Sequence, residues 1–217
     1  MKRLLSSTAL ALSLFLLSGC GETKTMRYRA TWEDPARASV LIESIERVIV
    51  RRLAAMNFMD PAVTVVPENQ TSAIVTVKAT TSEMQDAVTH IMTDPFSFEM
   101  KLETLQAEDW AASEWESTGV DGSNLLWVQA LGNKQTMEIS MDLEFNDQGK
   151  KILEELARTK QGKRLGIFVR DILVSMLTIQ SGSFADHVLI GGIPSTTIAE
   201  VFADDVNVGT RVSFTPF

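Results

Sequence analysis

The chain has 217 residues, of which 45% are hydrophobic and 22% are charged, the balance of an ordinary globular protein with one large or two small domains. Its formal net charge of −8 at pH 7 argues against a nucleic-acid partner, because proteins that bind phosphate backbones need a concentrated basic face. A single cysteine excludes an intramolecular disulfide and any metal site built from several cysteines.

The first twenty residues have the pattern of a secretory leader. Lys2 and Arg3 give a positive start, residues 4–17 form an apolar run, and small residues come just before Cys20. The run is shorter than the roughly 20 residues that a membrane-spanning helix needs. Because Leu17-Ser18-Gly19-Cys20 resembles the lipobox of bacterial lipoproteins, residues 1–20 are interpreted as a lipoprotein signal peptide. The alternative is an ordinary cleaved signal, or an uncleaved anchor with an incidental cysteine.

The lipobox implies both a partner and a location. In lipoproteins the thiol that Cys20 matches takes a diacylglyceryl group and the freed amine takes a further acyl chain such as palmitate. Two or more chains hold a protein stably on a membrane, whereas one is marginal. The expected location is the cell envelope, facing the periplasm. An Asp after the cysteine usually marks retention at the inner membrane in Gram-negative lipoproteins, so Gly21 favours the outer membrane.

After a polar tether at 21–25, residues 26–105 predict an α+β base of the ferredoxin-like type. Asp34-Pro35 is a helix-start signal, and Thr81 or Ser82 can begin a second helix. Strands are indicated by alternation and the helices by apolar spacing. The expected order is strand, helix, strand, strand, helix, strand, with strands at 26–32, 63–66, 73–79 and 96–102 and the first helix at 36–56.

The second half predicts a smaller α+β subdomain. Residues 104–124 lose the periodicity, so 106–134 is interpreted as a connecting segment and 135–217 as the second subdomain. Asn146 or Asp147 can cap a helix that Gly162 stops, and Ser195 or Thr196 can start another. Strands are expected at 125–130, 136–145, 165–169, 172–179 and 188–190, and a last extended piece at 211–214.

From Glu144 onward the sequence resembles the head subdomain of the first periplasmic domain of SecD, in the SecDF protein-export machinery. Residues 26–103 similarly resemble the base subdomain of that domain. Two departures stand out: SecD usually has Asp-Gly where Arg170-Asp171 stands, which leaves the turn type open, and Pro where Leu177 stands. The segments that carry the resemblance to the head are 145–151, 162–169, 174–175, 181–182 and 188–192.

The resemblance implies a stand-alone periplasmic module that binds unfolded or translocating polypeptide, or Sec and envelope proteins, without being an enzyme. The membrane domains of SecD, which carry its proton-coupled chemistry, have no counterpart in the sequence, so that chemistry is not implied. The alternative is a structural or partner-binding envelope lipoprotein that reuses the fold without a role in export.

Three tryptophans are the candidate peptide-binding residues: Trp110, Trp115 and Trp127. Aromatic side chains at a domain junction commonly hold apolar or peptide ligands, although core or hinge packing is the favoured explanation. Two separate histidines predict no metal site, and Ser181 to His187 lacks the G-x-S-x-G elbow of hydrolases. No cofactor is expected, because no phosphate-binding loop exists in the sequence.

Overall fold

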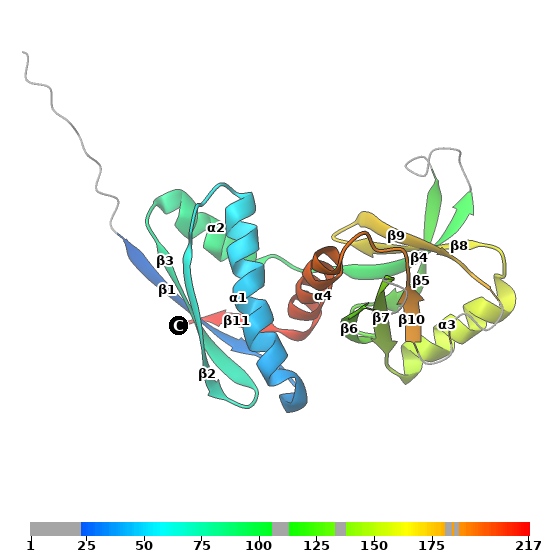
Figure 1. Ribbon diagram of the computed structural model, residues 1–217, viewed down its shortest axis with the longest axis horizontal. Coiled ribbons are helices and arrows are strands. Elements are labelled where there is room, and N and C mark those ends of the chain that lie inside the picture. Colours follow the sequence, from blue (N-terminus) through cyan, green and yellow to red (C-terminus); the bar gives the residue numbers. More distant parts are fainter. Residues whose placement is uncertain (1–22, 106–112, 133–137, 181–183, 185–186) are drawn as a thin grey trace, which may run out of the picture.

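The computed structural model describes residues 23–105, 113–132, 138–180, 184 and 187–217. Cys20 and Trp110 lie outside the described residues. The described chain forms two lobes, which we call the base and the head, with helix α4 (Thr196–Arg211) between them (Figure 1). Helices and antiparallel sheets occur together in it, which confirms the predicted α+β class.

The base is a single antiparallel sheet on which two helices pack (Figure 1). Its strands are β1 (Lys24–Thr31), β2 (Ala62–Asn69), β3 (Ser72–Ala79) and β11 (Ser213–Pro216). They are hydrogen-bonded in the order β11-β1-β3-β2. The helices are α1 (Ala38–Ala55) and α2 (Ser82–Thr93), and their buried faces join the sheet in one apolar core.

The sequence signals at the ends of the base helices are confirmed. Asp34 caps the 3₁₀ turn η1 (Pro35–Arg37), which leads into α1, by accepting a backbone hydrogen bond at 2.9 Å. Thr81 caps α2 by accepting from the backbone N–H of Met84 at 3.2 Å. Asn57 follows α1 with a φ of 67°, the left-handed conformation that ends many helices.

The head is built from two antiparallel sheets and helix α3 (Asp147–Thr159). One sheet has the order β5-β4-β8-β9 and the other the order β10-β7-β6. Apolar side chains of both sheets, α3 and α4 share one core. The strands are β4 (Phe98–Leu105), β5 (Glu114–Asp121), β6 (Leu125–Gly132), β7 (Ile139–Phe145), β8 (Arg164–Val169), β9 (Ile172–Thr178) and β10 (His187–Ile190).

One strand assignment was wrong. The prediction made residues 96–102 the last strand of the base, but this stretch forms β4, which pairs with β5 and β8 in the head. The place beside β1 is taken by β11, with Tyr28 to Thr31 facing Pro216 to Ser213. The ferredoxin-like order is kept, with its fourth strand supplied by the end of the chain. Alternation identifies the buried face of a strand and says nothing about its neighbour, which is why the sequence could not locate β4.

The predicted connecting segment also differs from the structure. Its described part holds β5 and β6, and both strands belong to the sheets of the head. The sequence did not predict β5. Its register with β4 shifts twice, between Met100 and Lys101 and between Glu103 and Leu105, and such irregular pairing disturbs the alternation that identifies a strand. Only Val120 of its residues is buried, so no alternation of apolar and polar residues marks the strand.

Helix α4 ties the two lobes together. Ala199, Ala203 and Val206 pack in the core of the head, and Val208 packs in the core of the base. Asn207 is buried and donates to the carbonyl oxygen of β6 residue Val128 at 2.8 Å. It also accepts from the backbone N–H of the same residue at 2.9 Å. Because β6 ends its sheet, this side-chain amide takes the place of a neighbouring strand.

Candidate functional site

A groove of about 710 Å³ opens where the β5-β4-β8-β9 sheet meets α4, and we call it the head groove. It is larger than two further cavities, of about 490 and 570 Å³, that border Trp127. Its lining is mostly apolar, as in binding sites for apolar ligands. The lining residues are Arg52, Phe96, Met141, Val169, Arg170, Val174, Ser175, 191–194, Thr197, Ile198, Val201, Phe202, Asp205 and Val206.

Separate parts of the sequence meet in the head groove. Ser195 caps α4 by accepting from the backbone N–H of Ile198 at 3.2 Å, which fixes where the helix begins. Ile198, Val201 and Phe202 then lie three and four residues apart, so one face of α4 forms a wall of the groove. Strand β9 contributes Val174 to the lining.

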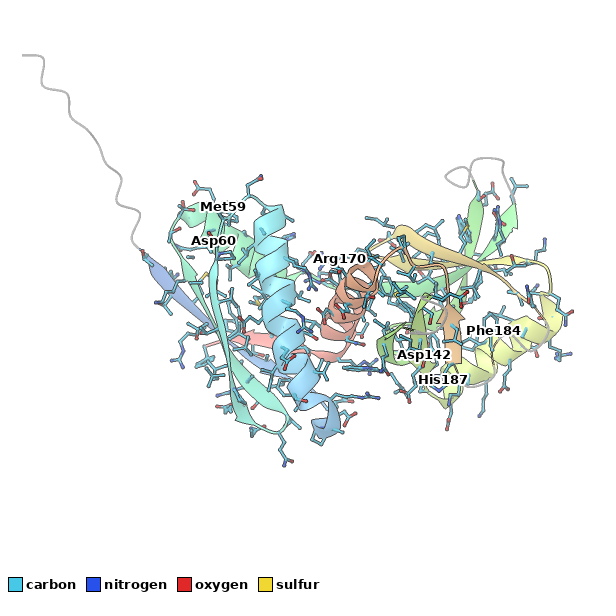
Figure 2. The ribbon with its side chains drawn as sticks, in the orientation of Figure 1. Met59, Asp60, Asp142, Arg170, Phe184 and His187 are labelled. Atoms are coloured by element: carbon cyan, nitrogen blue, oxygen red, sulfur yellow. The ribbon has the colours of Figure 1, made fainter. Side chains whose placement is uncertain are left out.

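The charged groups of the head groove are paired within the chain. Arg52 of α1 contacts Asp205 of α4, with 3.0 Å between Nη2 and Oδ1. Arg170 lies 3.8 Å from the carboxylate of Asp94 and sits over the ring of Phe96 at 5.7 Å. Figure 2 shows Arg170 beside α4, between the lobes. The groove therefore offers an occupant apolar surface and no unpaired arginine.

Strand β9 borders the head groove and ends its sheet. The strand has the sequence ILVSMLT, with no charged residue, glycine or proline. Three of its apolar side chains are exposed to solvent, Ile172 by 66%, Val174 by 43% and Met176 by 39%. Sheet edges in soluble proteins are usually guarded by charges or prolines, and this one carries neither.

The turn between β8 and β9 has the geometry of a tight hairpin. Arg170 and Asp171 have φ values of 50° and 61°, so both lie in the left-handed region. Two consecutive left-handed residues define a type I′ turn, the geometry that Asp-Gly sequences favour. The sequence departs from Asp-Gly at this turn, but the strands are still joined by a two-residue loop.

The three candidate tryptophans do not form one site. Trp110 lies outside the described residues. Trp127 is buried in the core of the base, and the guanidinium of Arg37 lies over its ring at 4.6 Å. Trp115 is half-buried on β5 and meets Phe168 edge to face, with the ring centroids 5.3 Å apart. The described Trp115 and Trp127 therefore lie on strands of different sheets, and neither lines the head groove.

Trp115 packs on the outer side of the β5-β4-β8-β9 sheet, over Gly166. A Cβ atom added to Gly166 would lie 2.7 Å from Trp115 and 2.8 Å from Phe168, so only glycine lets the rings approach the strand. Lys101 lies over the ring of Phe168 at 4.8 Å. Beside this cluster, Arg164 pairs with the buried carboxylate of Glu103, which holds the pKa of that carboxylate below its usual value.

A buried carboxylate fixes α4 against α1. Asp204 accepts hydrogen bonds from Ser44 at 2.7 Å, from Arg47 at 2.8 and 2.9 Å, and from Arg51 at 3.0 Å. Burial alone would raise the pKa of Asp204, but these hydrogen bonds outweigh it and keep the pKa below its usual value of 3.8. The charge of Asp204 therefore stabilises the junction at neutral pH.

The histidines lie apart from the head groove. His187 of β10 contacts Asp142 of β7, with 3.0 Å between Nδ1 and Oδ1, and Figure 2 shows the two residues together. His90 is exposed and lies near Asp94. Ser181, Ser183 and Asp186 are outside the described residues. In the part of the chain that the structure describes, no group of three or more His, Cys, Asp or Glu is placed to hold a metal ion.

Comparison with known proteins identifies the fold. No protein-family model matches the sequence, and no curated protein matches it. Three of the solved structures that match are of SecDF. The match with a TM-score of 0.50 shows that the chain has a fold like that of a SecD periplasmic domain. In SecDF of Thermus thermophilus, a translocon-associated membrane protein, the match is 16% identical with a TM-score of 0.50. It covers 89% of this chain and 30% of that one.

Two more SecDF structures match at 17% identity. One, of a membrane component that enhances protein export, has a TM-score of 0.47 and covers 89% of this chain and 99% of the matched chain. The other, in a super-membrane-facing form, has a TM-score of 0.48 and covers 90% of this chain and 30% of the matched one. Within the described ranges, no helix combines the length and apolar character that a bilayer-crossing helix needs.

Sequence reasoning missed the head groove. The apolar positions of β9 and α4 were evident, but their periodicity favoured burial in a core. A signal was nevertheless present, because residues 172–178 are uncharged throughout while an edge strand normally carries charges. This lack of charge indicates a binding edge only when β9 is known to end its sheet, which the structure shows.

Proposed function

We propose that this chain is a lipid-anchored, non-enzymatic envelope protein that binds unfolded polypeptide in the head groove. The observation that carries the proposal is the groove itself, about 710 Å³ in volume and mostly apolar. Unfolded chains expose the apolar residues that folded proteins bury, and such residues gain about 25 cal/mol per Å² on leaving water. The fold supports a role in export or envelope assembly, because the similar SecDF is a membrane component that enhances protein export.

The charged residues that the structure describes in the groove lining are all paired, which supports an uncharged occupant. Arg52 and Arg170 are engaged by Asp205 and Asp94, so a negatively charged ligand would have to displace partners that the chain already supplies. An apolar stretch of polypeptide needs no such exchange. A ligand of this kind is common to many unfolded proteins, so the proposal predicts broad selectivity.

Binding can be measured with a reduced and alkylated polypeptide that cannot fold, labelled with a fluorophore. Ile198→Arg places a charge on the wall of the groove at an exposed helix position, so folding should survive. Its affinity should fall by about tenfold, which corresponds to about 1.4 kcal/mol. Leu189→Arg is the matched control, because Leu189 is similarly exposed but does not line the groove. Equal loss in both variants, or no binding by the unaltered protein, refutes the proposal.

Crosslinking from the head in cells tests the role in export. The proposal expects captured partners to be nascent or unfolded chains, or components of the export machinery. Capture of folded envelope proteins alone would favour the second candidate, a partner-binding lipoprotein that reuses the fold. The cluster of half-buried Trp115 and buried Phe168 is the surface that favours this candidate, since aromatic residues are frequent in protein interfaces.

The anchor is tested separately, through the cysteine that the lipobox identifies. A Cys20→Ser variant should remain unprocessed by the lipoprotein peptidase, and no lipid should hold it at the membrane. Fractionation of cells should then find the variant in the soluble fraction. A variant that stays with the membrane would show that the attachment does not depend on this residue. Separation of inner from outer membranes would test the preference that Gly21 suggests.

A further inference from the structure

The free edge of β9 supplies a second kind of binding surface beside the head groove. The sheet order β5-β4-β8-β9 leaves the outer edge of β9 without a strand partner among the described residues. An unpaired edge presents a row of backbone N–H and C=O groups that another extended chain can pair with. Charges and prolines, which usually prevent this pairing, are absent from Ile172–Thr178.

The edge and the head groove are continuous. Val174 and Ser175 belong to β9 and also line the groove. In a sheet, alternate side chains of each strand point to the same face, and neighbouring strands lie about 4.8 Å apart. A strand added to β9 would therefore direct every second side chain to the face of the sheet on which the groove opens.

The shape of the edge favours a short segment. The register between β8 and β9 shifts where Ile167 pairs with Ser175 but Phe168 pairs with Leu173, so Val174 has no partner and the strand carries a bulge. A bulge bends a strand and interrupts long, straight pairing. Two copies of this chain would bring two bulged edges together and would add two bodies of formal charge −8. A short peptide segment meets neither obstacle.

We propose that β9 binds an extended, uncharged, apolar segment of another polypeptide as a fifth strand of its sheet, with alternate side chains of that segment in the head groove. This inference rests on the proposed function and names how the polypeptide is held. The backbone of the segment supplies hydrogen bonds whatever its sequence, and the groove selects apolar side chains. Charged segments are disfavoured, because Arg52 and Asp205 in the lining pair with each other and Arg170 pairs with Asp94.

The experiment compares two fluorescent peptides of about eight residues, long enough for one strand, with alternating valine and threonine. One has free amides and the other is N-methylated along its length, so it keeps its side chains but has no backbone N–H to donate, and its methyl groups hinder the close approach of a second strand. Fluorescence anisotropy should show binding of the free peptide and at least about tenfold weaker binding of the methylated one. Equal binding of both peptides would overturn the inference.

Met176→Lys adds to β9 the type of charge that guards natural edges, and should weaken binding of the free peptide by about tenfold. Met59→Lys is its control, because Met59 is an exposed methionine on the base, away from β9 (Figure 2). Equal effects of the two substitutions would overturn the inference.

The outcomes separate this inference from the proposed function. If both peptides bind equally and Ile198→Arg abolishes both, the groove binds polypeptide without strand addition, so only the inference fails. If neither peptide binds and the alkylated polypeptide does not bind, both fail. Sedimentation velocity gives a further check, because a dimer that Met176→Lys dissociates would show that the edge serves a second copy of this chain and would overturn the inference.

Discussion

Replacing Asp204 by asparagine tests how the two lobes are held together. The substitution keeps the size of the side chain and removes the charge that receives four hydrogen bonds from Ser44, Arg47 and Arg51. Removing one partner of a buried ion pair costs about 3–5 kcal/mol, because the other charge loses its compensation. Arg47 is half-exposed and can regain water, so the expected loss is nearer to about 2–3 kcal/mol.

Urea denaturation measures this loss as a lower midpoint, with Glu43→Gln as the control. Glu43 also pairs with Arg47, but at 3.4 Å and with its side chain 73% exposed, so its loss should cost less than about 0.5 kcal/mol. Equal effects of the two substitutions would show that burial of the Asp204 charge does not matter at this junction.

The pH dependence gives an independent check. Since the pKa of Asp204 is lowered in the folded protein, its contribution is complete above the usual value of 3.8 and is lost as the pH falls through the lower folded value. The difference in unfolding free energy between the protein and Asp204→Asn should therefore be constant at neutral pH and shrink below about pH 3.8. A difference that stays the same in acid would refute the reasoning.

Three further substitutions probe close packing. Gly166→Ala would push a methyl group against Trp115 and should cost about 1–3 kcal/mol in thermal unfolding, since overpacked sites force neighbours to move. Gly209→Ala in α4 would place its Cβ 2.2 Å from the ring of Phe96, so a loss of about 2 kcal/mol is expected despite the better helix propensity of alanine. Asn207→Asp removes the donor that satisfies a carbonyl of β6 and should cost about 1–3 kcal/mol by urea denaturation.

Each of these predictions has a control. Gly132→Ala should be nearly neutral, because nothing lies within 4 Å of the added methyl group and the glycine has no positive φ. Adding Phe96→Leu to Gly209→Ala should recover part of the lost stability, and no recovery would rule out the ring as the cause. For Asn207, the exposed Asn69→Asp at the β2–β3 turn tests the general effect of the same chemical change.

The sequence predicted local structure well because helix ends depend on neighbouring residues. The caps at Asp34, Thr81 and Asn146 are each fixed by a side chain that bonds a backbone N–H two or three residues later. Such contacts can be predicted without knowledge of the fold. Gly209 shows the limit of this reasoning: it lies in the last turn of α4, where its small size admits the ring of Phe96, a contact that neighbouring residues in the sequence do not reveal.

Long-range arrangement was harder to predict. The groove depends on the position of α4, and one contact that fixes this helix joins Asp204 to Arg47 of α1, far earlier in the chain. Opposite charges are abundant in the sequence, so nothing singles out this pair. The tryptophans illustrate the same difficulty, because Trp115 and Trp127 are close in the sequence but lie in different sheets.

The pairing of the first strand with the last has a consequence for how the protein is made. Strand β11 closes the edge of β1, and it follows every strand of the head in the sequence. During synthesis or passage across a membrane, every strand of the head emerges before the base can be completed. We therefore expect the head to acquire structure first, while one edge of β1 has no partner strand until β11 is available. Loss of the last few residues would then impair the lobe next to the N-terminus more than the head, an effect that proteolysis of C-terminally shortened chains can reveal.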